Sequence, residues 1–254
     1  MRVLIVGEVP FVDTLAGICR AKNHKVDLFL SDDLEDQAVL DGMVRAATRC
    51  QIAIESLNES QSGKLWLVEG IEANMPDAAP LLTSALAASA TEVAGWTEHA
   101  GRVVGYGLLP PFSTTGLVEF APALQSDFEA VSTARRFWEE LGFDVVRVPD
   151  APGLVRPRIV CGIINEAVRT LAASGISIED LDAALQFGMN FPRGPLTWAD
   201  EIGLDVVVGT LEALQRYLGE SRYHPAPLLR QKVYAGHLGK KTGRGFYAYK
   251  PLAP

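Results

Sequence analysis

The sequence has 254 residues, of which 48% are hydrophobic and 21% are charged. This composition supports one large domain or two smaller ones with a packed core, and it excludes general disorder. The formal net charge of -8 at pH 7 leaves no basic excess to attract phosphate backbones or anionic lipids. Nucleic acid is therefore excluded as a partner.

The lengths of the apolar runs indicate where in the cell the protein is expected. Residues 1–7 form a run that Glu8 interrupts, which is too short for a secretory signal. No run approaches the roughly 20 apolar residues needed to span a bilayer. We therefore expect a soluble, cytoplasmic protein that makes no membrane contact.

The cysteines and histidines indicate neither a disulfide framework nor a metal. Cys19, Cys50 and Cys161 are odd in number, widely separated and set in apolar contexts, which predicts buried free thiols. None of the four histidines lies at ligand spacing from a cysteine. We therefore expect no transition-metal site.

Short apolar runs alternate with stretches of helical spacing through the first half. The run that ends at Gly7 predicts a strand, and the spacing over 11–22 predicts a helix. Further strands are expected over 26–30, 51–56, 80–83 and 103–109, and helical stretches over 32–49 and 64–73. This alternation predicts a parallel, doubly wound α/β sheet.

The pattern changes near Pro152, after which helical stretches follow one another without intervening strands. We therefore predict an α/β domain over residues 1–150 and an all-α domain over residues 151–254. The junction near 149–153 has no low-complexity character, so the two domains should be joined tightly.

Boundary signals divide the second half into helices. The apolar stripe over 160–171 predicts a helix that Gly175 ends. Ser177 predicts the N-cap of the next helix. Thr197, with Asp200 three residues later, predicts a variant capping box before a helix over 202–218.

Several short segments of the second half have a characteristic order and spacing. They are 150–155 (DAPGLV), 165–167 (NEA), 180–184 (DLDAA), 188–195 (GMNFPRGP), 203–205 (GLD) and 239–247 (GKKTGRGFY). Together they closely resemble the C-terminal domain of 3-hydroxyacyl-CoA dehydrogenases. Upstream segments at 52–55, 59, 91–94 and 117–119 continue the resemblance, which covers nearly the whole chain.

The resemblance implies a Rossmann-like N-terminal domain that binds NAD. It also implies a helical C-terminal domain that completes a cleft for an acyl-CoA-like small molecule and forms a homodimer. In the family, a histidine takes the hydroxyl proton of the 3-hydroxyacyl-CoA while hydride leaves for the nicotinamide. A glutamate orients that histidine, and serine and asparagine side chains hold the substrate oxygen.

The nucleotide turn of the family reads Gly-x-Gly-x-x-Gly, whereas residues 7–12 here read GEVPFV. Val9 places a branched side chain where the backbone meets the phosphates, and Glu8 adds a negative charge beside it. Pro10 has no amide hydrogen to offer. These changes weaken the expected grip on a diphosphate.

The other nucleotide contacts are altered too. The acidic residue expected at the end of the second strand falls on Leu30, with Asp32 two residues later. Either a distorted NAD site uses Gly7, Asp32 and Glu59, or Gly7 is only a turn glycine, which we favour. The family also inserts a long helical hairpin that contacts CoA, and the segment 32–50 is too short to build one.

The catalytic positions differ most. By register with the family, the histidine position holds Gly107, while its glutamate partner is retained as Glu119. The positions of the substrate-holding serine and asparagine hold Leu86 and Pro157. Glu119 is either the surviving member of a catalytic pair or a polar residue beside a strand, and we favour the latter. A glycine cannot transfer a proton, so the classical mechanism lacks its base.

Substitutes for the lost groups are weak candidates. Ser84 and Arg158 are the candidate substrate-binding residues. A replacement base would come from Tyr106 or from a hydroxyl in the segment 113–115, assisted by a neighbouring cation, either Arg156 or Arg158. The segment around His99 is expected to be a solvated turn, and the basic run 239–245 a structural turn rather than a phosphate site.

Two hypotheses of different classes follow. The first is an NAD-linked oxidoreductase acting on a 3-hydroxyacyl-CoA or a related 3-hydroxy acid. The second is a catalytically silent family member that binds an acyl-CoA-like ligand or serves as a structural or regulatory subunit. Glu59 and Glu119 favour the first hypothesis, whereas Gly107, Leu86 and Pro157 favour the second.

Overall fold

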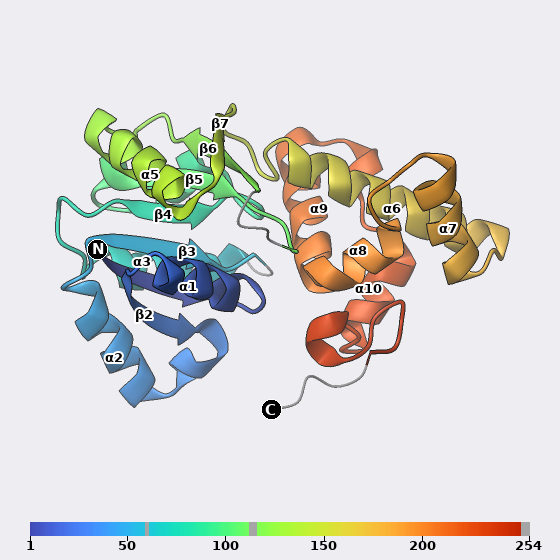
Figure 1. Cartoon of the computed structure of the whole chain (residues 1–254), viewed down its shortest axis with the longest axis horizontal. Helices are drawn as coiled ribbons and strands as arrows, with labels where there is room; N and C mark the ends of the chain where they lie inside the picture. The colour runs from blue at the N-terminus through green and yellow to red at the C-terminus, as the bar shows by residue number, and fades with distance from the viewer. Residues whose placement is uncertain (59–60, 112–115, 250–254) are drawn as a thin grey trace. The chain divides into compact units, whose positions relative to one another are not determined.

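The computed structural model describes residues 1–58, 61–111 and 116–249 (Figure 1). The chain divides into two compact units, one of Met1–Leu108 with Phe112–Val155 and one of Leu109–Pro111 with Arg156–Pro254. The first unit is α/β and the second is helical. This confirms the predicted fold class.

Within its described residues, the first unit contains a sheet of seven strands in the order β2-β1-β3-β4-β5-β6-β7. The strands are β1 Arg2–Gly7, β2 Lys25–Leu30, β3 Ile52–Ser56, β4 Leu81–Ser84, β5 Val103–Gly107, β6 Leu117–Pro122 and β7 Asp144–Arg147. The chain winds outward in both directions from β1 and β3. The carboxyl ends of these two strands therefore form the crevice where doubly wound sheets bind ligands.

Helices cover both faces of the sheet (Figure 1). They are α1 Phe11–Ala21, η1 Ser31–Glu35, α2 Gln37–Ala47, α3 Gln61–Glu72, α4 Ala90–Ala94, η2 Ala100–Arg102 and α5 Phe128–Leu141. The apolar stripes of α1 and α5 pack on one face, where Trp138 and Phe137 are buried. The stripes of α2, α3 and α4 pack on the other.

The alternating pattern predicts a parallel sheet, but the observed sheet is only mostly parallel. Strands β1 to β5 are parallel, but β6 runs antiparallel to β5 and pairs in parallel with β7. The predicted strand over 103–109 also ends earlier, at Gly107. Direction cannot be read from composition, because a buried strand has the same apolar pattern in either direction.

The helical unit consists of short and medium helices. They are α6 Arg156–Ser174, α7 Ile178–Gly188, α8 Pro195–Ile202, α9 Leu204–Leu218, η3 Ser221–Tyr223, α10 Pro227–Tyr234 and η4 Lys240–Thr242. Gly175, with φ of 68°, follows the end of α6, and the Ser177 side chain accepts a hydrogen bond from the Asp180 amide at the start of α7. Both boundary predictions are therefore confirmed.

The predicted capping box at Thr197 and Asp200 is wrong. Both residues lie inside α8, and α9 begins after Gly203. The Asp200 side chain is 1% exposed and accepts hydrogen bonds from the amides of Phe246 and Tyr247, at 2.8 and 2.9 Å. Its carboxylate therefore holds a distant segment of the chain rather than a helix end.

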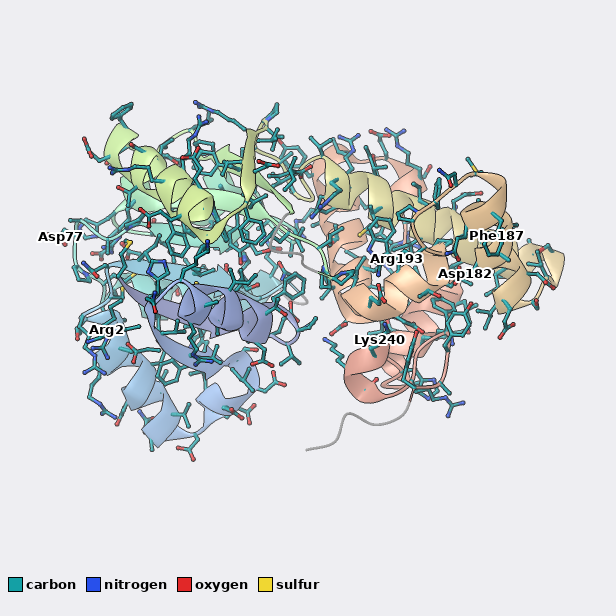
Figure 2. All side chains as sticks on the ribbon, viewed as in Figure 1. Arg2, Asp77, Asp182, Phe187, Arg193 and Lys240 are labelled. Carbon is teal, nitrogen blue, oxygen red and sulfur yellow. The ribbon has the colours of Figure 1, made fainter. Side chains whose placement is uncertain are left out.

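A second buried carboxylate explains the GMNFPRGP segment. Asp182 of α7 accepts hydrogen bonds from the amides of Leu196 and Thr197, at 2.8 and 2.9 Å (Figure 2). A Cβ atom on Gly194 would lie 2.1 Å from the Asp182 Cγ, so this position requires glycine. The carboxylate thus satisfies the first amides of α8, which have no partner within the helix.

The basic run 239–245 is tied down by hydrogen bonds and ion pairs within the helical unit. Lys240 pairs with Glu201 at 2.6 Å, and Lys241 pairs with Asp205. A Cβ on Gly239 would lie 2.4 Å from the Asp200 carbonyl oxygen. These contacts support the expectation of a structural turn.

The three cysteines are buried free thiols, as predicted. Burial raises the pKa of the Cys19 and Cys161 thiols to about 12, so both stay protonated near neutral pH. Among the described residues, no helix is long and apolar enough to cross a bilayer.

A buried ion pair lies at the amino edge of the sheet, where α3 ends and β5 begins. Arg102, 5% exposed, donates to the carboxylate of Glu72, 3% exposed, at 2.5 Å. The half-exposed His99 contacts the same carboxylate through Nδ1 at 3.1 Å. Burial alone would raise the pKa of Glu72, but Arg102 and His99 outweigh it and lower the pKa below its ordinary value of 4.5.

Glu72→Gln should lower the free energy of unfolding at pH 7 by about 3 kcal/mol, because it leaves the buried Arg102 charge uncompensated. The folded-state pKa of Glu72 is depressed, so its contribution is present above pH 4.5 and is lost as pH falls through the folded pKa. The free energies of unfolding of the wild type and of Glu72→Gln should therefore become similar at low pH. Urea unfolding of the two proteins from pH 7 to pH 3 measures this difference. Glu139→Gln, which breaks an exposed pair with Arg135, is the control and should cost less than about 1 kcal/mol. A Glu72 effect that did not change with pH would contradict the assignment.

Candidate functional site

The turn between β1 and α1 lies at the crevice of the sheet. Gly7 ends β1 with φ of 151°, and a Cβ there would lie 2.4 Å from the carbonyl oxygen of Ser56, at the end of β3. Position 7 therefore needs glycine for the close approach of two neighbouring strands. This requirement holds whether or not a nucleotide binds.

The first amides of α1 are occupied within the turn itself. The Phe11 and Val12 amides donate to the Glu8 carbonyl oxygen at 3.1 and 3.2 Å. Pro10, which precedes the helix, has no amide hydrogen. Helix N-termini bind phosphates through free amides, and these amides already have a partner.

The Glu8 side chain is directed inward and is 6% exposed. Its Oε1 accepts hydrogen bonds from the backbone amide of Asn58 at 2.7 Å and from its Nδ2 at 3.1 Å. The Asn58 Oδ1 in turn accepts from the Ser84 hydroxyl at 2.5 Å. A buried carboxylate thus connects the carboxyl ends of β1, β3 and β4.

A buried ion pair reinforces the same edge. Lys64 of α3 and Glu55 of β3 are both 0% exposed and form a salt bridge. Lys64 Nζ also donates to the Leu57 carbonyl at 3.1 Å, and the Thr83 hydroxyl donates to Glu55 at 2.7 Å. Each charge has further hydrogen-bond partners, which is the condition under which a buried pair is tolerated.

The position assigned by sequence register to the family's histidine lies on the neighbouring strand pair β5 and β6. Gly107 of β5 pairs directly with Glu119 of β6, so the structure brings these two predicted residues together. A Cβ on Gly107 would lie 3.5 Å from Glu119 Oε2 but only 2.6 Å from Leu154 Cδ1. The Leu154 side chain therefore occupies the space into which a longer side chain at position 107 would extend.

Glu119 has a structural partner of its own. It is 4% exposed, and its Oε2 accepts a hydrogen bond from the Val155 amide at 3.0 Å. This contact holds the segment that carries Leu154 against β6. The favoured interpretation of Glu119 as a polar residue beside a strand agrees with this geometry.

The remaining predicted site residues lie in different elements or outside the described residues. Asp32 lies exposed in η1, and Ser84 is buried in the Glu8 network. Arg158 belongs to the helical unit, where its Nε donates to the Tyr223 hydroxyl at 2.7 Å. Glu59 and the segment 113–115 lie outside the described residues.

Alternative bases near Gly107 are unsuited to the task. The Tyr106 hydroxyl is buried and donates to the Glu55 carbonyl oxygen at 3.2 Å, and burial raises its pKa well above its usual value. His99 precedes β5 and so lies at the opposite, amino edge of the sheet. It lies exposed in a turn, as expected, and also contacts Glu72.

Sequence analysis missed Asn58 and Lys64. Asn58 follows β3 and Lys64 lies on α3. Both side chains are polar, and polar side chains are usually exposed. The only sequence signal was their position just after β3, at the carboxyl edge where ligand-facing residues collect. In the described part of the chain, no group of three or more His, Cys, Asp or Glu side chains is arranged to hold a metal ion.

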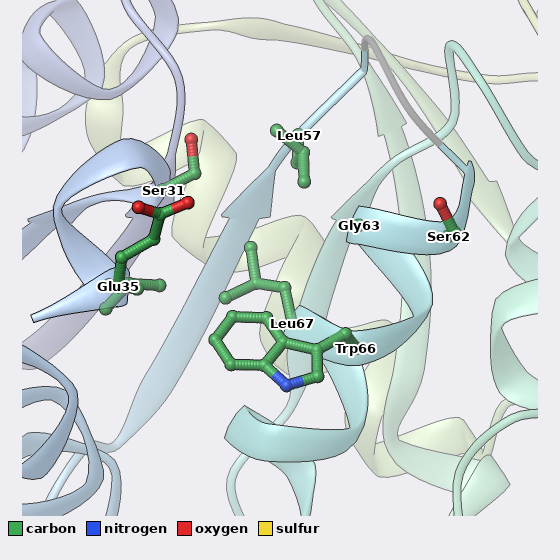
Figure 3. Close-up of a pocket in the computed structure, with 8 residues that line it drawn as sticks. Ser31, Glu35, Leu57, Ser62, Gly63, Trp66 and Leu67 are labelled. Carbon is green, nitrogen blue, oxygen red and sulfur yellow. The ribbon is translucent and has the colours of Figure 1, made fainter. Parts of the chain in front are cut away.

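A cavity of about 450 Å³ lies beside this edge, between η1 and α3 (Figure 3). Ser31 and Glu35 line it from η1, and Trp66 and Leu67 from α3. Leu57 contributes from the end of β3. The cavity is thus formed entirely by the first unit.

Comparison with known proteins identifies both units. A family model for the 3-hydroxyacyl-CoA dehydrogenase C-terminal domain matches residues 153–249, and one for the NAD binding domain of the same family matches residues 23–151. The second match begins after α1, so the turn at 7–12 lies outside it.

Individual relatives agree with these matches. The chain is 36% identical over 204 residues to a probable 3-hydroxybutyryl-CoA dehydrogenase of Bacillus subtilis, covering 80% of this chain and 71% of the relative. It is 33% identical over 205 residues to a 3-hydroxybutyryl-CoA dehydrogenase of Bradyrhizobium diazoefficiens, covering 81% and 70%.

Solved structures show the same likeness. The crystal structure of (S)-3-hydroxybutyryl-CoA dehydrogenase PaaH1 from Ralstonia eutropha superposes with a TM-score of 0.76 at 27% identity, covering 98% of this chain and 99% of that one. The sequence resemblance is confirmed: this chain belongs to the 3-hydroxyacyl-CoA dehydrogenase family.

Proposed function

We propose that this chain is a family member that does not perform the classical oxidation of 3-hydroxyacyl-CoA. In this proposal it serves acyl-CoA metabolism as a ligand-binding or structural subunit, with domains over 1–150 and 151–254. The observation that carries the proposal is the packing at Gly107. The base is missing, and Leu154 fills the space that a base would need.

Proton transfer has no evident substitute among the described residues of this edge. Glu119 is engaged by the Val155 amide, and the raised pKa of Tyr106 keeps its phenol protonated. The Ser84 hydroxyl donates to Asn58. Each of these groups is therefore held by a partner or kept protonated, and none is placed to act as the base.

NAD is the cofactor that the matched NAD binding domain implies, in agreement with the expectation from resemblance. The nucleotide turn does not fit its diphosphate. Glu8 places a carboxylate at the crevice. The backbone carbonyl oxygen of Glu8 also accepts hydrogen bonds from the first two amides of α1. A diphosphate in the usual position would meet a negative charge and would find the Glu8, Phe11 and Val12 amides already bonded to carbonyl oxygens of the protein.

A second candidate function is NAD-linked oxidation of 3-hydroxyacyl-CoA. One observation favours it: Glu119 keeps its position directly opposite residue 107, as a catalytic pair would need. The names of the relatives point the same way. Under this alternative, an exogenous or unassigned base replaces the histidine.

A homodimer through the helical unit is part of the proposal. Exposed apolar side chains on α6 and α7 support it, among them Ile159 at 55% and Phe187 at 82% exposure. An exposed apolar surface of sufficient area marks an association site. The cytoplasmic location likewise stays a prediction.

Reduction of acetoacetyl-CoA by NADH, followed by nicotinamide absorbance, tests the proposal. We expect a rate at least about 10²-fold below that of the Bacillus subtilis relative assayed alongside, because the general base is absent. Calorimetric titration with acetoacetyl-CoA then separates a ligand-binding subunit, which releases or absorbs heat, from a structural one. Turnover within about tenfold of the relative would overturn the proposal in favour of the oxidoreductase.

The packing at position 107 is tested by a double-mutant cycle. Gly107→Ala should lower the free energy of unfolding by about 1–3 kcal/mol, because its Cβ collides with Leu154. In a Leu154→Ala background, most of that cost should disappear. Gly162→Ala in α6, where a Cβ meets nothing within 4 Å, is the control and should be neutral or stabilising. Equal costs for Gly107→Ala in both backgrounds would contradict the assigned role of Leu154.

A further inference from the structure

The helical unit has a pocket of its own between α6 and α7, the helices labelled in Figure 1. Its volume of about 360 Å³ lies within the range of small-molecule pockets. The lining residues come from α6, from α7 and from the short segments that follow each helix. The pocket is therefore formed by the helical unit alone.

Small side chains leave the space that forms this pocket. Ala167 of α6 and Ala184 of α7 line it, together with the larger Ile163, Leu181 and Leu185. Protein interiors are close-packed, so an alanine on each of two neighbouring helices leaves a hollow unless a larger side chain fills it. Apolar walls offer water few hydrogen bonds, which favours an aliphatic occupant.

The pocket opens to solvent at the segment that follows α7. Met189 lines it and is 62% exposed, and Phe191, which also lines it, is partly buried. A methionine side chain is unbranched and has three rotatable bonds, so it adapts to the shape of an occupant. The mouth of the pocket is thus suited to a flexible chain.

The polar groups of the pocket both lie on α6. Glu166 and Thr170 are four residues apart, which places them on one face of the helix, and both are exposed. In the described part of the chain, no Lys, Arg or His forms an ion pair with Glu166. The Glu166 carboxylate and the Thr170 hydroxyl can each accept a hydrogen bond from the head group of a ligand.

The charge around the pocket opposes an anionic ligand. None of the described residues that line it is cationic, and the first turn of α7 adds Glu179 and Asp180. Arg169 precedes Thr170 in α6, but its Nη2 donates to the His224 carbonyl oxygen at 2.7 Å. A carboxylate or phosphate would therefore meet like charges, whereas an ammonium group would meet opposite ones.

From these features we infer that the pocket binds a short aliphatic chain whose head group donates a hydrogen bond, an alkyl alcohol or alkyl ammonium ion, in preference to an alkyl carboxylate. The chain lies between α6 and α7, and the head group faces Glu166 and Thr170. This inference goes beyond the proposed function, because the ligand is neither an acyl-CoA nor a nucleotide. Neither Ile159 nor Phe187, which support the proposed homodimer, lines the pocket.

Calorimetric titration of the full chain with octylamine, 1-octanol and octanoate at low ionic strength tests the inference. Octylamine should bind at least about fivefold more tightly than octanoate, with 1-octanol between them, because only the head-group charge differs. From 1-butanol through 1-hexanol to 1-octanol, affinity should rise about three- to fourfold for each added methylene group that the pocket buries.

Two variants locate the binding in this pocket. Ala184→Leu should weaken 1-octanol binding at least about tenfold, because the added side chain occupies part of the pocket and position 184 is exposed enough to tolerate it. Ala172→Leu, at an exposed position of α6 that does not line the pocket, is the matched control and should leave the affinity unchanged.

A second pair of variants probes the head group. Glu166→Gln should reduce the ratio of octylamine to octanoate affinity by about threefold or more, since it removes a negative charge beside the head group. Glu212→Gln removes an exposed carboxylate of α9 and should leave the ratio unchanged.

Four outcomes would overturn the inference. They are octanoate binding as tightly as octylamine, no detectable 1-octanol binding at millimolar concentration, and unchanged 1-octanol affinity in Ala184→Leu. The fourth is a 1-octanol affinity that falls as sedimentation velocity shows the chain associating, because a second copy would then cover the pocket. The acetoacetyl-CoA assay reports turnover and not alcohol binding, so failure here is distinguishable from failure of the proposed function.

Discussion

The buried carboxylate of Glu8 is the interaction on which the carboxyl edge of the sheet depends. It accepts hydrogen bonds from the Asn58 amide and side chain, and Asn58 connects it to Ser84. A buried anion is tolerated only when such donors surround it. Because the donors come from the protein itself, the crevice is stabilised without any bound ligand. The same region of a dinucleotide-binding domain normally leaves its donors free for a phosphate.

Much of the architecture could be predicted from the sequence, because it follows from hydrophobic periodicity and from residues that begin or end helices. Alternating strands and helices indicated the doubly wound sheet, and Gly175 and Ser177 marked the boundary between α6 and α7. Family motifs also singled out Gly107 and Glu119, which the structure pairs directly across β5 and β6. These are properties of neighbours in sequence or of long, regular segments, for which local pattern is informative.

The rest depends on contacts between residues far apart in sequence. Leu154 lies 47 positions beyond Gly107, and no local pattern indicates that its side chain fills the space there. Lys64 is a charged residue that begins a predicted helical stretch, and only the structure shows that it is fully buried against Glu55. Asp200 imitates a capping residue in the sequence but binds the amides of Phe246 and Tyr247 instead. Tertiary contacts overrode the local signal in each case.

The changes at the two ends of this edge have a common physical character. In the turn, the Glu8 carboxylate accepts from Asn58, and the Glu8 carbonyl oxygen accepts from the first amides of α1. Beside β5, Leu154 fills the space next to Gly107, and the Val155 amide engages Glu119. Under the proposed function, each of these residues replaces a ligand-facing group with one that is satisfied inside the protein. Reversing a single one leaves its neighbours in place, so restoring a histidine at 107 would still require removal of Leu154 and a free nucleotide turn.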